Sequence, residues 1–175
     1  MVPQTGLKGT GVLVPVVGPD GAEKATLIAS ARGTYSGNSA IVFAKPLVAA
    51  SGLYAGPDHP VSPAEFSALK AAGAFAVSWQ GKDGSHGLPV SIFDDLTDGR
   101  VVVAAVSRSV IPQLRRRHSR VHVIYLNAGR SGHPQAGGGI DIPEPPVTVI
   151  DNSGPLTEAV EDFLGVLETY VPMSS

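Results

Sequence analysis

The sequence predicts an α/β fold with a mainly parallel sheet. Several short runs are continuously apolar, which is typical of strands buried on both faces. Helix-forming segments separate these runs, and an alternation of strands and helices favours parallel pairing. The clearest runs are 11–17, 100–106, 121–126 and 147–150.

In the first half of the chain, strand 11–17 contains Pro15, which lacks an N–H group and would cost the ladder one hydrogen bond. A helix is expected over 24–32 and a strand over 40–45, with a loop over 47–60. Ser62 then caps a helix that ends at Gly73, with Pro63 at its first position and Glu65 completing a capping box.

In the second half, the sequence predicts a strand over 75–79, a polar hairpin-like turn over 80–84, and helices over 90–96 and 110–118. Segment 127–146 holds five glycines and four prolines, so no regular element is expected there. A final helix follows Gly154-Pro155. Its apolar face comprises Leu156, Val160, Phe163, Leu164 and Leu167.

Composition bounds the class of protein. A chain of 175 residues fits one domain, 1–175. The net charge of −2 favours neither a nucleic-acid partner nor a polybasic membrane anchor, and the lack of Cys excludes disulfides and thiolate metal sites. The first ten residues lack the apolar core of a signal peptide, and no apolar run reaches the ~20 residues of a membrane span. The expectation is a cytoplasmic protein; the oligomeric state stays open.

Residues 18–25 partly match the phosphate-binding pattern G-x-x-x-x-G-K-[ST]. Gly18 and Lys24 have the required separation, and Gly21 lies between them. Glu23 replaces the second glycine, and Ala25 replaces the hydroxyl that would bind Mg²⁺. The segment is therefore either a phosphate-binding loop or its remnant.

Each remaining candidate has a structural alternative. Lys24 is a phosphate ligand or forms an ion pair with Glu23 or Asp20, and the basic run Arg115 to Arg117 binds phosphate or is a solvated helix face. Ser107-Arg108 follows a strand, at the edge where α/β sheets bind ligands. The histidines lack metal-ligand spacing, so no metal site is predicted.

Several segments in order and spacing resemble ribose 1,5-bisphosphate phosphokinase, a guanylate-kinase-like family. They are Phe75-Ala-Val-Ser-Trp79, His86-Gly-Leu-Pro89, Asp98-Gly-Arg-Val-Val-Val103, Ser107-Arg108 and Val147-Thr-Val-Ile-Asp-Asn-Ser-Gly154. The resemblance covers about 12–167. It implies a P-loop kinase-like three-layer α/β/α fold with a small acceptor-binding insertion at about 39–89. The family makes phosphoribosyl diphosphate from ribose 1,5-bisphosphate and ATP in phosphonate metabolism.

By this resemblance, Gly18, Gly21, Lys24, Asp151 and Asn152 are the nucleotide and phosphate residues. The segment Asn152-Ser-Gly-Pro is also an ordinary helix start. The resemblance assigns acceptor contacts to a further set, Asp58, His59, His86, Ser107 and Arg108.

Two phosphate-handling segments depart from the family. Val48-Ala-Ala-Ser51 lacks the arginine expected beside the acceptor phosphate. The lid is replaced by the tract 127–146, in which Arg130 is the one arginine.

Two classes of function follow. The first is a pseudoenzyme that holds a phosphorylated metabolite, a nucleotide or a protein partner on a kinase fold. The second is an active kinase that uses ATP and Mg²⁺. No catalytic residue is assigned.

Overall fold

The computed structural model describes residues 11–18, 22–49, 59–81, 84–127, 147–151 and 154–171, with only the backbone of 22, 23 and 59. Five parallel strands form the main sheet, in the order β2-β7-β1-β8-β9. Their bounds are β1 Val12–Val17, β2 Ile41–Phe43, β7 Val101–Ala105, β8 Val123–Asn127 and β9 Val147–Asp151. The predicted parallel α/β sheet is confirmed.

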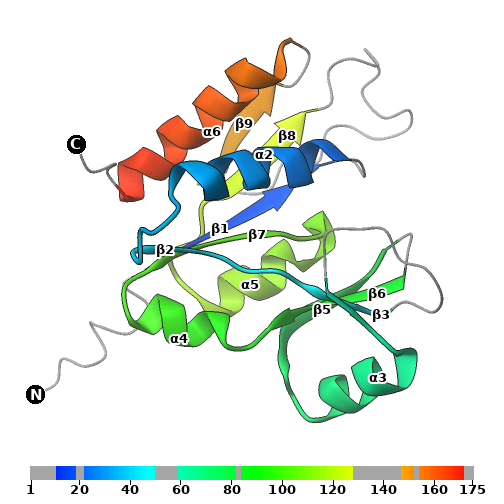
Figure 1. The fold of residues 1–175 in the computed structure, drawn as a ribbon. Helices are drawn as coiled ribbons and strands as arrows, with labels where there is room; N and C mark the ends of the chain where they lie inside the picture. The colour runs from blue at the N-terminus through cyan, green and yellow to red at the C-terminus, as the bar shows by residue number, and fades with distance from the viewer. Residues whose placement is uncertain are drawn as a thin grey trace, which may run out of the picture.

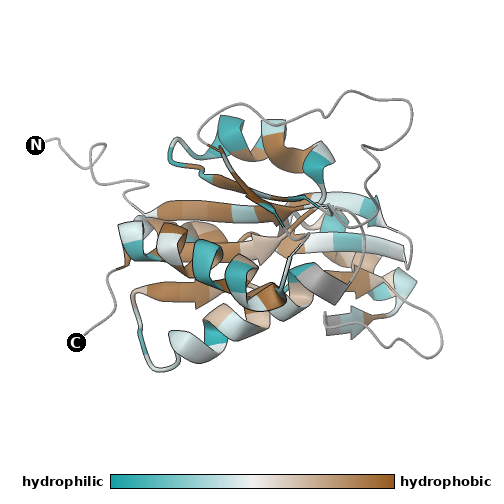
Figure 2. Ribbon diagram, turned by 90° about the horizontal axis from the view of Figure 1, so that it is seen from above, coloured by the Kyte–Doolittle hydropathy of each residue, from teal (hydrophilic) through white to brown (hydrophobic). Residues whose placement is uncertain are grey.

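Helices cover both faces of this sheet (Figure 1). On one face, α2 (Ala22–Thr34) and α6 (Leu156–Tyr170) enclose a core that includes Leu27 and Phe163. On the other face, α4 (Ile92–Thr97) and α5 (Ile111–Arg117) enclose a second core that includes Leu114. Figure 2 shows apolar strands between helices whose outer faces are hydrophilic. The chain therefore has three layers, as expected.

Pro15 lies in the central strand. Leu13 N donates to Arg120 O and Leu13 O accepts from His122 N, so odd-numbered residues of β1 turn their polar groups toward β8. The N–H that Pro15 lacks is therefore missing on the β8 side. On that side, an isolated bridge at Leu13 precedes the pairing that starts at Val16. The predicted loss of one ladder hydrogen bond at Pro15 therefore falls between these two points of β1–β8 pairing.

A second sheet is built from residues between β2 and α4. Its strands are β3 Leu47–Ala49, β4 His59–Val61, β5 Phe75–Gly81 and β6 Gly84–Pro89, in the order β4-β3-β6-β5. Helix α3 (Pro63–Ala71) packs beside it, with the rings of Phe66 and Phe75 stacked 4.7 Å apart. Ala76, Val77 and Leu88 belong to the second core, so this sheet is continuous with the main body.

Two predicted loops are partly wrong. The expected loop 47–60 contributes β3 and part of β4, and the expected turn 80–84 contributes the ends of β5 and β6, while residues 50–58 and 82–83 lie outside the described part. These strands take their stability from cross-strand neighbours, which local propensity does not encode.

The ends of two helices test the sequence patterns. Ser62 Oγ accepts from Glu65 N at 3.1 Å, which confirms the predicted cap of α3. In α6, Phe163 and Leu167 are buried as expected, but Leu156 is 40% exposed. Side chains on a helix lean toward its N-terminus, so the first residue of α6 points past the helix start. None of the described helices is long and apolar enough to cross a membrane.

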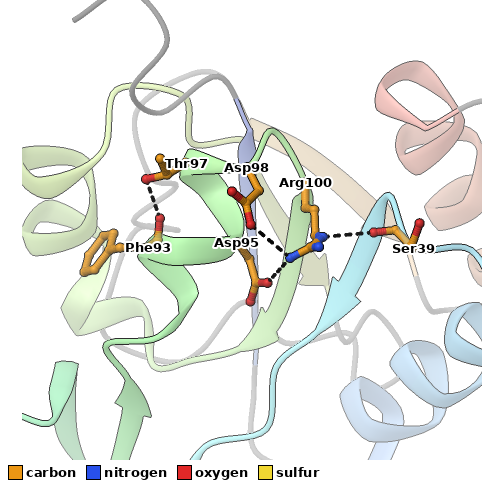
Figure 3. Close-up of polar contacts among 6 residues, drawn as sticks. All are labelled: Ser39, Phe93, Asp95, Thr97, Asp98 and Arg100. Carbon is orange, nitrogen blue, oxygen red and sulfur yellow. Dashed lines mark hydrogen bonds and ion pairs between the residues drawn. The ribbon is translucent and has the colours of Figure 1, made fainter. Parts of the chain in front are cut away.

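Arg100 lies directly before β7, and its side chain contacts three other residues (Figure 3). Its Nη1 lies 2.8 Å from Asp95 and 3.4 Å from Asp98, and its Nε donates to Ser39 O at 3.1 Å. Gly99 before it has a φ of +87°, a conformation that glycine adopts at low cost. The Asp98-Gly-Arg motif is therefore a structural link between α4, β7 and the segment before β2.

Candidate functional site

The carboxyl ends of β1 and β7 form the candidate site. Val16 is in register with Ala105, and Val106 N donates to Val16 O at 3.1 Å, so Gly18 and Ser107 leave the sheet side by side. The helix after β1, α2, covers one face, whereas the helix after β7, α5, covers the other. Ligands of open α/β sheets bind where adjacent strands diverge in this way.

Gly18 has a structural reason to be glycine. A Cβ atom there would lie 2.7 Å from Leu126 O and 3.1 Å from Leu126 Cβ, and its φ is +159°. The end of β1 therefore lies so close to Leu126 of β8 that a side chain would not fit at position 18. The predicted role of Gly18 in ligand binding is untested, and Gly21 lies outside the described residues.

Lys24 lies in the first turns of α2 and points back to the loop. Its Nζ donates a hydrogen bond to Gly18 O at 3.2 Å. Since α2 begins at Ala22, Glu23 and Ala25 belong to the same first turn. Amide N–H groups at a helix start have no partner within the helix and attract anions. The residues around this helix start fit a phosphate group only in part, because Glu23 already brings a negative charge and Ala25 offers no hydroxyl.

Ser107 and Arg108 start the short 3₁₀ helix η1 (Arg108–Val110). Ser107 Oγ accepts from Ser109 N at 3.2 Å and lies 2.8 Å from Ser109 Oγ. Ser107 is therefore a cap, while the side chain of Arg108 is exposed at the carboxyl edge of the sheet.

The three arginines of the basic run on α5, Arg115 to Arg117, differ in their contacts. Arg117 Nη1 donates to Ala76 O at 2.6 Å, and Arg115 Nη1 donates to Val121 O at 3.3 Å. Arg116 is exposed. Two of these arginines thus bond to the backbone of the chain itself, which neither a phosphate site nor a wholly solvated face predicts.

Asp151 is the last residue of β9, in register with Asn127 on β8, and its side chain is exposed. One strand, β8, separates it from β1. The neighbouring Asn152 lies outside the described residues, as do Arg130 of the lid tract and Asp58. For His59 only the backbone is described, at the start of β4.

His86 is a predicted acceptor residue and lies on β6, in register with Trp79 of β5. Their rings stack with centroids 5.5 Å apart and planes 3° apart. Strand β5 also contacts η1, the short helix that carries Arg108. Sequence reasoning did not pair Trp79 with His86. The two-residue separation of Gly81 and Gly84 was the available signal, because it fixes the hairpin register that opposes Trp79 and His86.

Comparison with known proteins gives relatives of one kind. Ribose 1,5-bisphosphate phosphokinase of Rhodopseudomonas palustris is 44% identical over 124 residues, which span 71% of this chain and 64% of that protein, slightly less than two thirds. The protein of the same name from a Chelativorans species is 34% identical over 181 residues, covering 90% of this chain and 85% of the relative. No protein-family model matches the chain.

A solved structure supports the fold. Guanylate kinase from Anaplasma phagocytophilum superposes with a TM-score of 0.65, covering 93% of this chain and 87% of that one, at 16% identity. At this identity the match establishes the fold alone, which is a guanylate-kinase-like P-loop kinase fold. Taken with the sequence relatives, it places the chain in the ribose 1,5-bisphosphate phosphokinase family.

Proposed function

We propose that this chain binds a phosphorylated ligand at the carboxyl edge of its main sheet and transfers phosphate from ATP weakly or not at all. The observation that carries the proposal is the first turn of α2, where Glu23 precedes Lys24 and the lysine bonds to Gly18 O. The strand, the close-approach glycine and the lysine of a phosphate loop are present. The charge beside them has the wrong sign for a triphosphate.

Electrostatics decides how far this matters. Phosphoryl transfer depends on neutralising negative charge over the transferring oxygens. At ~4 Å and an effective dielectric of ~20, one like-charge contact costs on the order of 4 kcal/mol. A loss of that size corresponds to about three decades of affinity. Conversely, an acidic residue in the first turn of a helix stabilises the helix by about 0.3–1 kcal/mol, so Glu23 suits an empty loop better than an occupied one.

Family membership favours a second candidate, an active kinase that converts ribose 1,5-bisphosphate to phosphoribosyl diphosphate with ATP and Mg²⁺. The relatives reported above are named ribose 1,5-bisphosphate phosphokinase. A direct assay of phosphoribosyl diphosphate formation separates the two. Turnover at ~1–100 s⁻¹ establishes the kinase, whereas turnover orders of magnitude lower supports the binding role.

Calorimetry tests the binding half of the proposal. We expect Mg·ATP to bind with weaker than micromolar affinity to the parent chain, and a micromolar titration would contradict this. The double variant Glu23→Gly with Ala25→Ser restores the charge and hydroxyl pattern of the loop, and we expect it to bind Mg·ATP at least tenfold more tightly (~1.4 kcal/mol). A Glu161→Gln variant serves as a control, because it removes one negative charge from an exposed side chain on α6, and a change in net charge alone should leave the affinity unaltered. If the double variant binds no better than the parent, the loop is not the limiting defect.

A further inference from the structure

His122 contacts two other elements of the fold through its two ring nitrogens. It directly precedes β8, and its Nδ1 lies 2.5 Å from Tyr170 Oη in the last turn of α6. Its Nε2 lies 2.7 Å from Thr148 Oγ1 on β9. The rings of His122 and Tyr170 meet edge to face, with their centroids 5.6 Å apart. These three half-buried side chains, the His122 cluster, therefore connect the end of α6 to the main sheet.

A second tyrosine holds the same helix end by a bond that involves no histidine. Tyr35 Oη donates to Val171 O at 2.9 Å, and both residues are buried. Burial first, and the charge of Glu168 second, raise the pKa of Tyr35 above its usual value. This phenol therefore stays neutral at and below neutral pH. The end of α6 is thus held at two points, and only the His122 cluster contains a group that titrates near neutrality.

The directions of the two hydrogen bonds of His122 follow from the chemistry of its partners. A neutral imidazole has one N–H donor and one bare nitrogen that accepts, so one hydroxyl accepts from the ring and the other donates to it. A phenol, with a pKa of about 10, is a stronger donor than an aliphatic hydroxyl because it is more acidic. Tyr170 therefore donates to Nδ1, and Nε2–H donates to Thr148 Oγ1.

We propose that the His122 cluster is a pH-sensitive attachment of α6: the neutral imidazole holds the last turn of the helix on the sheet, and protonation releases that turn. A proton taken up at Nδ1 makes both ring nitrogens donors, so the O–H of Tyr170 loses its acceptor. The bond to Thr148 survives, because Thr148 already accepts. The inference is independent of the proposed function, since His122 lies at the amino-terminal end of the sheet and Gly18 follows the carboxyl end of β1.

The cations around His122 oppose a charge on its ring. Arg115 of α5 donates to Val121 O, the carbonyl directly before His122, at 3.3 Å. Burial is the main reason that the pKa of His122 lies below its usual value, and the charge of Arg115 adds to this effect. Arg120, two residues before His122, is a further cation and is exposed. A protonated ring would therefore gain by leaving this half-buried position for water.

Among the described residues, no carboxylate forms an ion pair with His122. On α6, Glu168 is exposed, and its charge acts on Tyr35. Strand β1 carries no ionisable side chain, and the one on β9, Asp151, lies three residues beyond Thr148. In this part of the chain, the charge of an imidazolium thus has no partner of opposite sign. The attachment is complete above about pH 6.5 and is lost as the pH falls through the lowered pKa of His122.

Hydrogen exchange at the end of α6 tests the release. Val171 N donates to Leu167 O at 2.8 Å, so the Val171 amide reports whether the last turn is closed. We expect its protection factor, which corrects for the intrinsic pH dependence of exchange, to fall several-fold between pH 7.5 and pH 5.5. Urea at concentrations below the unfolding transition should not change it, because a local opening exposes little surface. Protection that is equal at both pH values, or that falls with urea as steeply as that of the Val103 amide, contradicts the inference.

Two tyrosine variants separate the two attachments. Tyr170→Phe keeps the ring but removes the donor, so the protection of the Val171 amide should be lower at pH 7.5 and no longer depend on pH. Tyr35→Phe is the matched control, because it removes one hydroxyl from the same helix end. It should lower protection at both pH values and leave the pH dependence in place. If both variants respond to pH in the same way, the dependence does not arise at the His122 cluster and the inference is wrong.

NMR titration of His122 gives a second test that needs no released helix. Linkage is reciprocal, so a bond to Tyr170 that protonation breaks must itself lower the pKa of His122. Tyr170→Phe should therefore raise the pKa of His122, whereas Thr148→Val, which removes an acceptor, should not raise it. Nitrogen chemical shifts of the parent at pH 7.5 should place the proton of the neutral ring on Nε2. A proton on Nδ1, or a pKa that Tyr170→Phe leaves unchanged or lowers, overturns the inference.

Discussion

Arg117 fastens the small sheet to the body of the protein, and replacing it by Met tests that role. The guanidinium donates to Ala76 O on β5 at 2.6 Å and lies 4.8 Å from the ring centroid of Phe93 on α4. One side chain of α5 thus connects three elements. Met keeps the apolar stem over Phe93 but removes the donor and the charge.

The expected cost follows from these two contacts. A hydrogen bond from a charged group contributes about 1.5–3 kcal/mol, and a cation–π contact at an exposed site contributes about 0.5–1 kcal/mol. Arg117 is an exposed residue, and water can replace the lost donor at Ala76 O, so the lower end of each range applies. We expect Arg117→Met to lower the free energy of unfolding by ~2 kcal/mol. For a domain of this size that corresponds to a Tm lower by ~4–8 °C.

Arg116→Met is the matched control, because it removes the same charge from the next residue, whose side chain is exposed. Its free energy of unfolding should change by less than ~0.5 kcal/mol. Urea unfolding gives the global value for both variants. Hydrogen exchange should show faster exchange of the β5 amides in Arg117→Met alone. If the two variants unfold at the same urea concentration, the bond to Ala76 O does not hold the small sheet and the reasoning fails.

Two further predictions concern stability. Burial first, and the charge of Arg115 second, lower the pKa of His122 below its usual value. The contribution of His122 to the free energy of unfolding is therefore complete above about pH 6.5 and is lost as the pH falls through the lowered pKa. The unfolding midpoint in urea should drop between pH 7.5 and 5.5, and this drop should be smaller in His122→Asn. Arg100→Met removes the ion pair to Asp95 and the bond to Ser39 O and should cost ~1–2 kcal/mol in thermal unfolding, whereas a Tm equal to that of the parent would show that water replaces both contacts.

The main sheet was predictable because its strands are buried on both faces. A run such as Val101 to Ala105 is apolar at every position, which is typical of a strand buried on both faces and does not match the spacing of an amphipathic helix. The small sheet lacks that signal. Leu47 to Ala49 is three residues long and becomes a strand by pairing with β4 and β6, so its stability comes from distant residues. Segments of this length are where tertiary pairing outweighs local propensity.

At the candidate site, residue types could be predicted from the sequence, but the directions of their side chains could not. The pattern around Lys24 indicated a loop after β1, and the structure adds that the lysine bonds to Gly18 O. For the run Arg115 to Arg117, helical periodicity cannot say which member meets a carbonyl until the position of β5 is known. The pairing of Trp79 with His86 likewise depends on the hairpin register, which a count of residues between Gly81 and Gly84 could have supplied.

The contacts of Lys24 and the charge of Glu23 indicate which substitution would restore phosphate binding. A lysine ammonium has three N–H donors, so Lys24 can keep its hydrogen bond to Gly18 O while it donates to a phosphate. The bond to Gly18 O is therefore no obstacle to binding. The like-charge cost at position 23 is on the order of 4 kcal/mol and would remain. We therefore propose that the acidic residue limits phosphate binding, and we expect Glu23→Gly alone to recover most of the affinity of the double variant and Ala25→Ser alone to recover little.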